Sequence, residues 1–292
     1  MKSNICYLLV LCLFSGCVKG QSELDNVFYA FNNAVRSLPN APGGMDAQAK
    51  FIKEIGFDGF SGHHSEDYFA RRKAMDKVGL SMPEIYLPVT INADGSATFK
   101  EDLYDIIKDA RERNLLIALA AFSDDFKDNK EEGDKYLVKA IQELVDHAAS
   151  YNVKIAVYPH ANFYCERLDH SIKIAKMVDR PNVGAIFNTC HLFKVEGTDN
   201  WEKKLKEAIP FLYMISINGL DDGDTQSMDW DRLIKPLGEG SFDTYKIVKV
   251  AKDHGYEGPF GLQCYNIKQD CKKALTTSMN TWKTYQRKYA EN

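Results

Sequence analysis

Short apolar segments alternate with amphipathic segments along most of the chain. The apolar segments have the length and the flanking Gly, Asn and Pro residues of buried β-strands. The amphipathic segments carry apolar residues at helical spacing, as Leu137, Ile141 and Leu144 do. We expect eight strands, within residues 27–32, 57–62, 82–89, 115–122, 153–159, 183–188, 211–217 and 259–265. We expect helices at residues 46–55, 67–78, 101–113, 135–151, 169–178, 201–209, 244–253 and 271–289.

Eight strand–helix units, with strands mostly roughly 25 to 40 residues apart, predict an α/β fold, a (β/α)8 TIM barrel in a single domain. The alternative is a doubly wound open sheet, which usually has a Gly-rich turn after its first strand. Segment Asn32–Val35 contains no glycine, and this favours the barrel. The one long interval, between residues 211 and 259, predicts an elaborated loop over the C-terminal mouth of the barrel. Its Trp230 either shields that mouth or packs against Leu233 and Leu237.

The N-terminal segment has the pattern of a signal peptide. Lys2 precedes the apolar run Ile5–Phe14, which is too short to span a bilayer. Two processing routes remain open: lipidation of Cys17 after a lipobox-like Ser15-Gly16, or simple cleavage after Gly20. We therefore expect a signal peptide over residues 1–20 and a folded barrel over 24–292. The mature protein would be exported, either periplasmic or anchored to the outer membrane of a bacterium through lipid at Cys17.

Charge and cysteine content limit the function classes. The net charge is −4 with mixed signs, so there is no basic stripe of the kind that binds nucleic acid. This balance suits an uncharged or small ligand. Four cysteines follow the expected signal peptide, and an even number in an exported protein permits disulfides. Free buried thiols fit a chain of this size equally well. These cysteines are Cys165, Cys190, Cys264 and Cys271.

Polar side chains gather at the C-terminal ends of the expected strands, where TIM barrels place their ligands. Most are imidazoles, phenols and amides, which form hydrogen bonds without carrying charge and therefore suit a polyhydroxylated ligand. The alternative is that the amides only satisfy loop backbone groups. Such side chains are His63, Tyr158, His160, Asn188, His191, Ser216, Asn218 and Gln263.

Three motifs carry a resemblance to a known superfamily. Segment Asn188–His191 (NTCH) resembles an Asp-Thr-x-His element, segment Pro236–Asp243 (PLGEGSFD) contains a Gly-Glu-Gly element, and segment Gly255–Phe260 (GYEGPF) resembles a Gly-Tyr-x-Gly turn. In this order and spacing they resemble the xylose-isomerase-like TIM-barrel superfamily, over residues 27–263. That superfamily includes sugar phosphate isomerases and epimerases and the endonuclease IV type of DNA-repair enzyme.

The sequence departs from this superfamily at the residues that bind its metal ion. The epimerases of the superfamily bind a divalent ion through Glu, Asp, His and Glu on strands five to eight. The matching residues here are Tyr158, Asn188, Ser216 and Gln263, which carry no charge and are poor ligands for hard cations. We therefore expect neither a metal nor another cofactor. The missing ligands and the acidic charge also argue against DNA repair.

Two functions remain open. In the first, the protein is an exported sugar isomerase- or epimerase-like enzyme without the metal of the superfamily. His191 or His160 would transfer the proton, because imidazole titrates near neutral pH. Tyr158 and Glu239 would assist, and the expected substrate contacts are Tyr158, Asn188, Asn218, Gln263 and His63. In the second, the protein is a non-catalytic carbohydrate-binding barrel. The sequence leaves the oligomeric state open.

The role expected for His191 depends on whether its side chain is solvated or buried. If the barrel is correct, His191 is a solvated pocket residue that projects from the end of the sixth strand. Its replacement by Ala would then abolish ligand binding or turnover and cost little stability. The alternative is a structural histidine whose ring nitrogens satisfy buried loop backbone, so that its loss costs stability instead.

Overall fold

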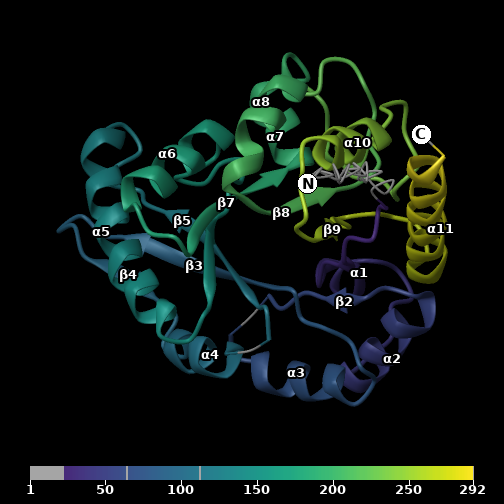
Figure 1. The fold of residues 1–292 in the computed structure, drawn as a ribbon, viewed down its shortest axis with the longest axis horizontal. Coiled ribbons are helices and arrows are strands. Elements are labelled where there is room, and N and C mark those ends of the chain that lie inside the picture. The colour runs from purple at the N-terminus through teal and green to yellow at the C-terminus, as the bar shows by residue number, and fades with distance from the viewer. Residues whose placement is uncertain (1–22, 64, 112, 292) are drawn as a thin grey trace, which may run out of the picture.

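Eight parallel strands form the barrel in the computed structural model, which describes residues 23–63, 65–111 and 113–291. The chain order of these strands is also their order around the barrel, and the helices surround them (Figure 1). Parallel bridges from Gly59 to Ser81 and from Gly62 to Ile85 close the ring. The predicted TIM barrel is therefore confirmed. The strands are β1 (Phe28–Ala30), β2 (Gly59–Phe60), β3 (Glu84–Ile91), β5 (Leu116–Phe122), β6 (Lys154–Val157), β7 (Val183–Asn188), β8 (Leu212–Ile217) and β9 (Phe260–Leu262).

Each predicted helix is present, with ends that differ by a few residues. They are α2 (Met45–Ile55), α3 (Tyr68–Asp76), α4 (Leu103–Ala110), α5 (Lys130–Ala149), α6 (Leu168–Val178), α8 (Trp201–Ala208), α10 (Tyr245–Asp253) and α11 (Cys271–Ala290). Short helical segments that the sequence analysis missed are α1 (Asn33–Arg36), α7 (Thr189–Glu196), α9 (Trp230–Leu233) and the 3-10 turn Ile209–Phe211. Helix α11 contacts α1 and α2, so the last unit packs against the first.

The predicted signal peptide, with Cys17, lies outside the described residues. In the part of the chain that is described, no helix is long and apolar enough to cross a membrane. The four cysteines of that part are all buried and free, so the structure supports thiols over disulfides.

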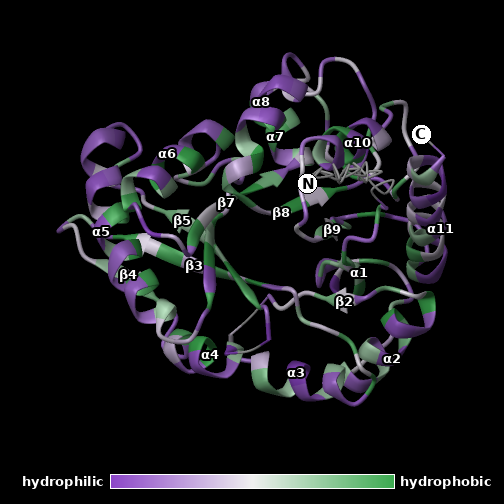
Figure 2. Cartoon of the chain, viewed as in Figure 1, coloured by the Kyte–Doolittle hydropathy of each residue, from purple (hydrophilic) through white to green (hydrophobic). Residues whose placement is uncertain are grey.

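Side chains alternate between two apolar layers along each strand, as the β pleat requires. Ala118 and Ala156 point into the barrel together with Tyr29, whereas Ile117 and Ile155 point outward and pack under the helices. The strands are accordingly apolar, and the helices are polar on their outer sides (Figure 2). Small residues leave room for inward aromatic rings: a Cβ on Gly261 would lie 2.3 Å from the Phe31 ring.

Strand β3 is longer than its neighbours and extends beyond the barrel. Its outer half pairs antiparallel with β4 (Ala97–Phe99), an edge strand that the sequence analysis missed. Because Ile85 bridges to Gly62 at the end of β2, the first residues of β3 already stand at the mouth of the barrel. Glu84 and Tyr86 lie there on one face of the strand.

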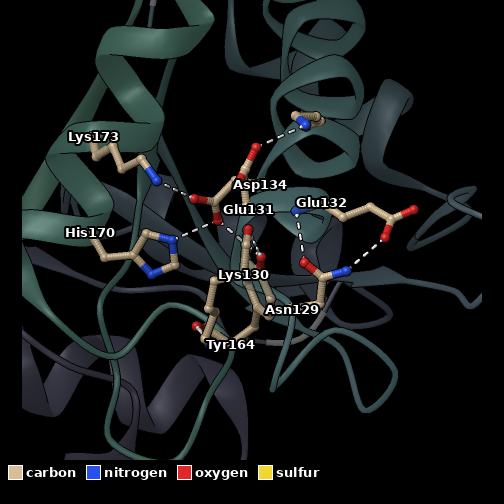
Figure 3. A network of polar contacts seen from close by, with 9 residues as sticks. Asn129, Lys130, Glu131, Glu132, Asp134, Tyr164, His170 and Lys173 are labelled. Atoms are coloured by element: carbon tan, nitrogen blue, oxygen red, sulfur yellow. Dashed lines mark hydrogen bonds and ion pairs between the residues drawn. The ribbon is translucent and has the colours of Figure 1, made fainter.

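A buried carboxylate anchors the segment that follows β6. Asp134 on α5 accepts hydrogen bonds from the Tyr164 hydroxyl at 2.9 Å, from His170 Nε2 at 2.7 Å and from Lys173 Nζ at 2.8 Å (Figure 3). The Lys130 ammonium donates to the Tyr164 carbonyl. The segment is also tied within itself, since the His160 amide donates to the Cys165 carbonyl at 3.0 Å. This cluster fixes the loop that presents His160 to the barrel mouth.

Candidate functional site

A cavity of about 510 Å³ opens at the C-terminal mouth of the barrel. Its walls are contributed by β1, β2, β3, β6, β9 and the segments that follow them, together with α7 and the long loop after β8. Aromatic rings and polar side chains make up most of these walls. The lining residues are Phe31, Asn32, Asn33, Arg36, Ser37, Ser61, Gly62, His63, Glu84, Tyr86, Tyr158, His160, Ala161, Asn162, Phe163, His191, Trp230, Ile234, Gln263 and Tyr265.

An aromatic belt runs around one side of this cavity, formed by His63, Tyr86, Tyr158, His160, His191 and Trp230. Neighbouring ring centroids along it are 5.3, 5.1, 6.1, 3.7 and 5.3 Å apart. Flat rings that present both faces and edges pack well against the C–H faces of a sugar while their polar atoms bond its hydroxyls. The predicted mouth residues His63, Tyr158, His160, His191 and Gln263 thus all line one cavity, as expected from their strand ends.

His160 has one ring nitrogen fixed and the other available. Its Nδ1 lies 2.8 Å from the carbonyl oxygen of Ala161, and because a carbonyl can only accept, Nδ1 carries the hydrogen. Nε2 therefore keeps a lone pair. The ring stacks on Phe163 with a centroid distance of 3.8 Å. Burial lowers the pKa of His160 to about 4, so the imidazole is neutral at physiological pH. A neutral imidazole with a free Nε2 can accept a proton.

His191 is buried and not solvated, which corrects the expectation from sequence. Only 4% of its surface is exposed, because it lies in the first turn of α7, under Trp230 and beside His160. Asn188 caps that turn, with its side-chain oxygen 3.5 Å from the His191 amide nitrogen. The ring Nδ1 accepts the Ala161 N–H at 3.4 Å. Burial, followed by the nearby His160, lowers the pKa of His191 well below its usual value. This histidine satisfies loop backbone as the structural alternative requires, and it also lines the cavity.

Three of the four residues at the strand ends β6 to β9 have side-chain hydrogen bonds within the protein, and the Ser216 hydroxyl has none among the described residues. Asn188 Nδ2 donates to the Tyr158 hydroxyl at 2.5 Å, and Asn188 Oδ1 accepts from Cys190 Sγ at 3.2 Å. The side-chain oxygen of Gln263 accepts from the Asn33 amide group and from the Cys264 backbone N–H. Ser216 is fully buried. Tyr158 and Gln263 line the cavity, but Asn188 and Ser216 lie behind its wall.

Two further predicted residues do not reach the cavity. The Asn218 side chain donates to the carbonyl oxygens of Gly219 and Leu233, both at 2.7 Å, and so organises the long loop after β8. Glu239 accepts a hydrogen bond from Gln269 at 2.7 Å and is not among the lining residues. The structure therefore does not place Asn218, Glu239 or Asn188 among the residues that line the cavity. A strand-end position fixes the height of a residue on the barrel, but the loop conformation decides where its side chain goes.

Asn32 is a lining residue that the sequence analysis missed. It follows β1, is 3% exposed, and neither atom of its side-chain amide has a hydrogen-bond partner within the described part of the protein. A buried amide without a partner costs on the order of 1–3 kcal/mol for each unmet group. Because the Asn32 amide lines the cavity, its oxygen and nitrogen can form hydrogen bonds with a ligand. The only sequence signal was an Asn directly after a strand.

Glu84 is the second lining residue that was missed. It begins β3, is 2% exposed, and forms no side-chain hydrogen bond or ion pair with any residue that the structure describes. Burial raises the pKa of Glu84 to about 8, so at neutral pH most of the molecules carry an uncharged carboxylic acid here. The signal in the sequence was a lone acidic residue inside an apolar strand segment.

The long loop between β8 and β9 covers one side of the mouth, as predicted. Trp230 and Ile234 from this loop line the cavity. Trp230 contacts His191 edge to face, and the Lys194 ammonium lies 6.0 Å from the centre of its ring. Trp230 also packs against the apolar cluster that contains Leu233 and Leu237, so it has features of both alternatives left open by the sequence.

A family model described as xylose isomerase-like TIM barrel matches residues 49–284. The chain belongs to this family. None of the curated proteins compared with the chain matches it significantly. Several solved structures share the fold over nearly their whole length.

One such neighbour is the IOLI protein with a bound zinc atom, at 16% identity and a TM-score of 0.69, covering 90% of this chain and 98% of that one. Another is the 3-keto-D-glucoside 4-epimerase YcjR from E. coli, at 17% identity and a TM-score of 0.66, covering 85% and 98%. A third is the D-psicose 3-epimerase with D-tagatose from Clostridium cellulolyticum H10, at 14% identity and a TM-score of 0.65, covering 89% and 98%. At these identities the likeness establishes the fold.

The residues at the metal-ligand positions of the family do not fit a divalent ion. A phenol, two amides and a hydroxyl occupy these positions, and the Tyr158, Asn188 and Gln263 groups are already bonded to protein partners. Across residues 23–63, 65–111 and 113–291, no three or more His, Cys, Asp or Glu side chains are grouped to hold a metal. The cavity imidazoles of His160 and His191 are 3.7 Å apart between ring centroids, and neither is joined by a carboxylate ligand among these residues. The donor set suits hydrogen bonding to a neutral ligand.

Proposed function

We propose that this member of the xylose isomerase-like family binds a small neutral carbohydrate in the mouth cavity and acts on it by proton transfer, without a divalent metal. The observation that carries this proposal is the cavity itself. It combines an aromatic belt, uncharged hydrogen-bonding groups and a neutral His160 with its Nε2 lone pair available. Two structural neighbours are named as sugar epimerases, which supports a sugar as the ligand class.

The roles of the two histidines differ in this proposal. His160 is the base, because its Nδ1 is held by a carbonyl and its ring lines the cavity. His191 positions it: the two rings are in contact, and its own Nδ1 is occupied by the Ala161 N–H. The substrate contacts we propose are Tyr158, Gln263 and His63, together with Asn32. We further propose that residues 1–20 direct the protein out of the cytoplasm of a bacterium.

Deuterium exchange tests the proposal directly. D-tagatose and a methyl 3-keto-D-glucoside are incubated with the protein in D₂O, and loss of the C–H signal next to the carbonyl is followed by NMR. We expect enzyme-dependent exchange that is lost in His160→Gln and retained in His254→Gln, whose side chain is exposed on the barrel surface. Chelator should leave the exchange rate unchanged. Exchange that survives His160→Gln would contradict the assignment of the base.

A non-catalytic carbohydrate-binding barrel is the second candidate. The observation in its favour is that three of the residues at the family's metal-ligand positions are held by protein hydrogen bonds, through the Tyr158–Asn188 bond and the bonds that Gln263 accepts. Calorimetric binding of either probe sugar, combined with no exchange over days, would establish this candidate over the enzyme.

A further inference from the structure

The side of the cavity formed by β1 to β3 contains a buried carboxyl group, that of Glu84. Glu84 and Tyr86 are two residues apart on β3 and both line the cavity. The Tyr86 ring contacts Tyr158 edge to face, with centroids 5.1 Å apart, and Tyr158 in turn neighbours His160. Glu84 and His160 therefore border the same cavity, with two tyrosine rings along the wall between them.

We propose that Glu84 is the general acid of this cavity, giving its proton to the carbonyl oxygen of a keto sugar while His160 removes a proton from the adjacent carbon. This inference rests on the proposed function and extends it from one proton-transfer group to two. A metal would otherwise stabilise the charge that develops on that oxygen. Here a carboxylic acid supplies the same stabilisation by donating a hydrogen bond and then the proton.

The step balances without any further reactant. The C–H bond next to the carbonyl breaks, and its electron pair forms the C=C bond of an enediol. The proton goes to Nε2 of His160, and the carbonyl oxygen takes the proton of Glu84. His160 is left as an imidazolium and Glu84 as a carboxylate. If the proton on His160 is replaced by one from solvent before it returns to the same carbon, and the oxygen returns its proton to Glu84, the sugar has exchanged hydrogen with solvent. If His160 instead protonates the former carbonyl carbon, the carboxylate of Glu84 takes the proton of the other enediol hydroxyl, the carbonyl forms on that neighbouring carbon, and the sugar is isomerised.

The environment of Glu84 supports its holding a proton. The groups that face it are the phenols of Tyr29 on β1, Tyr86 on β3 and Tyr158 on β6, whose own pKa values are raised by burial. The described structure provides no lysine or arginine that pairs with Glu84, and Arg36 stands exposed at the rim of the cavity. His160 is shifted the opposite way, to a pKa of about 4. Two groups in one cavity with pKa values moved apart in this manner are the usual signature of an acid and a base.

The test compares wild type with Glu84→Gln, which keeps the shape and the hydrogen-bonding capacity but has no proton to transfer. Exchange into D-tagatose and the methyl 3-keto-D-glucoside in D₂O is measured from pH 4 to 10, with calorimetric binding of the same probes. We expect Glu84→Gln to bind them with affinity within about twofold of wild type, because it keeps its polar contacts. We expect its exchange rate to fall by about 100-fold or more, the usual contribution of a general acid.

The pH profile separates a chemical role from a structural one. Wild-type exchange should decline as pH rises through about 8, where Glu84 loses its proton, and this decline should be absent from the residual rate of Glu84→Gln. Glu84→Gln should also melt at or above the wild-type temperature, since it removes a buried ionisable group without a partner. A structural role predicts a lower melting temperature and an unchanged pH profile, and that result would overturn the proposal.

Two negative results are distinguishable. If wild type exchanges protons and Glu84→Gln exchanges them equally fast with the same alkaline decline, Glu84 is not the acid and the proposed function stands. If wild type binds the probes but exchanges no proton at any pH, the proposed function and the role of Glu84 both fail. A ¹³C-carboxyl NMR titration in which Glu84 titrates near pH 4 in wild type would also overturn the proposal.

Discussion

The imidazole rings of His160 and His191 lie 3.7 Å apart between centroids, with their planes inclined by 38°. Two charged imidazoles would not be stable at this separation, and burial lowers the pKa of each below its usual value. The Nε2 atoms of the two neutral rings also differ. Nδ1 of His160 donates to a carbonyl, so its Nε2 has the lone pair. Nδ1 of His191 accepts from a backbone N–H, so its Nε2 carries the hydrogen. The pair is a neutral unit with one available base, at Nε2 of His160.

His191→Ala should lower the free energy of unfolding by roughly 2–4 kcal/mol, because it leaves a cavity and an unpaired Ala161 N–H. This reverses the sequence-based expectation of a small cost. Urea unfolding followed by circular dichroism measures it, with His254→Ala as an exposed control expected to change little. Ligand binding by the folded fraction of His191→Ala should also weaken, since His160 loses its neighbour. An unchanged urea midpoint would show that the ring is not part of the packed loop.

Asn32→Leu should leave stability unchanged or raise it by about 1 kcal/mol, because the substitution removes two buried polar groups that have no partners. It should at the same time abolish binding of the probe sugars. The matched control is Tyr29→Phe, which removes a buried hydroxyl without a partner among the described residues, from a residue that does not line the cavity. Tyr29→Phe should bind as wild type does. Calorimetry and thermal melts on the three proteins separate the two effects, and a destabilised Asn32→Leu would indicate a structural amide.

The sequence predicted the barrel well because period and spacing are local properties. Each expected strand and helix is found, whereas β4 and α7 were missed. Helix α7 begins at the last residue of β7, where Asn188 serves as a helix cap, and the NTCH segment alone gave no sign of a further helical turn. The β4 edge strand has little apolar character of its own and forms only by pairing with β3.

Part of the candidate site could also be predicted, because the position of a residue at the end of a strand is a local property of the sequence. Tyr158, His160 and Gln263 follow strands directly, so their height on the barrel placed them at the cavity. Glu84 lies at the start of β3, and only the register between β2 and β3 brings it to the same height. Asn218 was expected there and is instead held by the carbonyl oxygens of its own loop. Register and loop conformation are set by tertiary packing, which the pattern of one segment does not contain.

Asp134→Asn should reduce stability in a pH-dependent way. Burial alone would raise the pKa of Asp134, but the hydrogen bonds from His170 and Lys173 outweigh it and lower the pKa to about 2. A lowered carboxyl pKa contributes stability that is fully present above about pH 4, the unfolded value, and is lost as pH falls toward 2. Wild type should therefore exceed Asp134→Asn by roughly 2–3 kcal/mol at pH 7 and by little near pH 2.

The control for this experiment is Glu131→Gln on the same helix, whose ion pair with Lys135 is exposed to solvent. Exposed pairs contribute little, so this variant should follow the wild-type curve. Denaturant unfolding at a series of pH values provides the measurement. A constant difference between wild type and Asp134→Asn across the whole range would mean that the carboxylate charge is not what stabilises the cluster.

The purified mature protein should carry no stoichiometric Mg²⁺, Mn²⁺ or Zn²⁺, and EDTA should leave its melting temperature unchanged. The reason is the chemistry of Tyr158, Asn188, Ser216 and Gln263, which supply no carboxylate or imidazole at the metal-ligand positions of the family. Elemental analysis of the protein purified without chelator is the test. About one equivalent of any of these ions per chain, with a lower melting temperature after EDTA, would contradict it.

The protonated Glu84 and the neutral histidine pair leave Arg36 as the one permanently ionised side chain among the described residues that line the cavity. A mouth of this kind provides little electrostatic steering of an uncharged sugar, so the association rate depends on diffusion and on contact with the aromatic rings. Since there is little charge to screen, added salt should change neither the rate of capture nor the affinity for an uncharged sugar. The protein would then bind equally well in dilute and in saline surroundings.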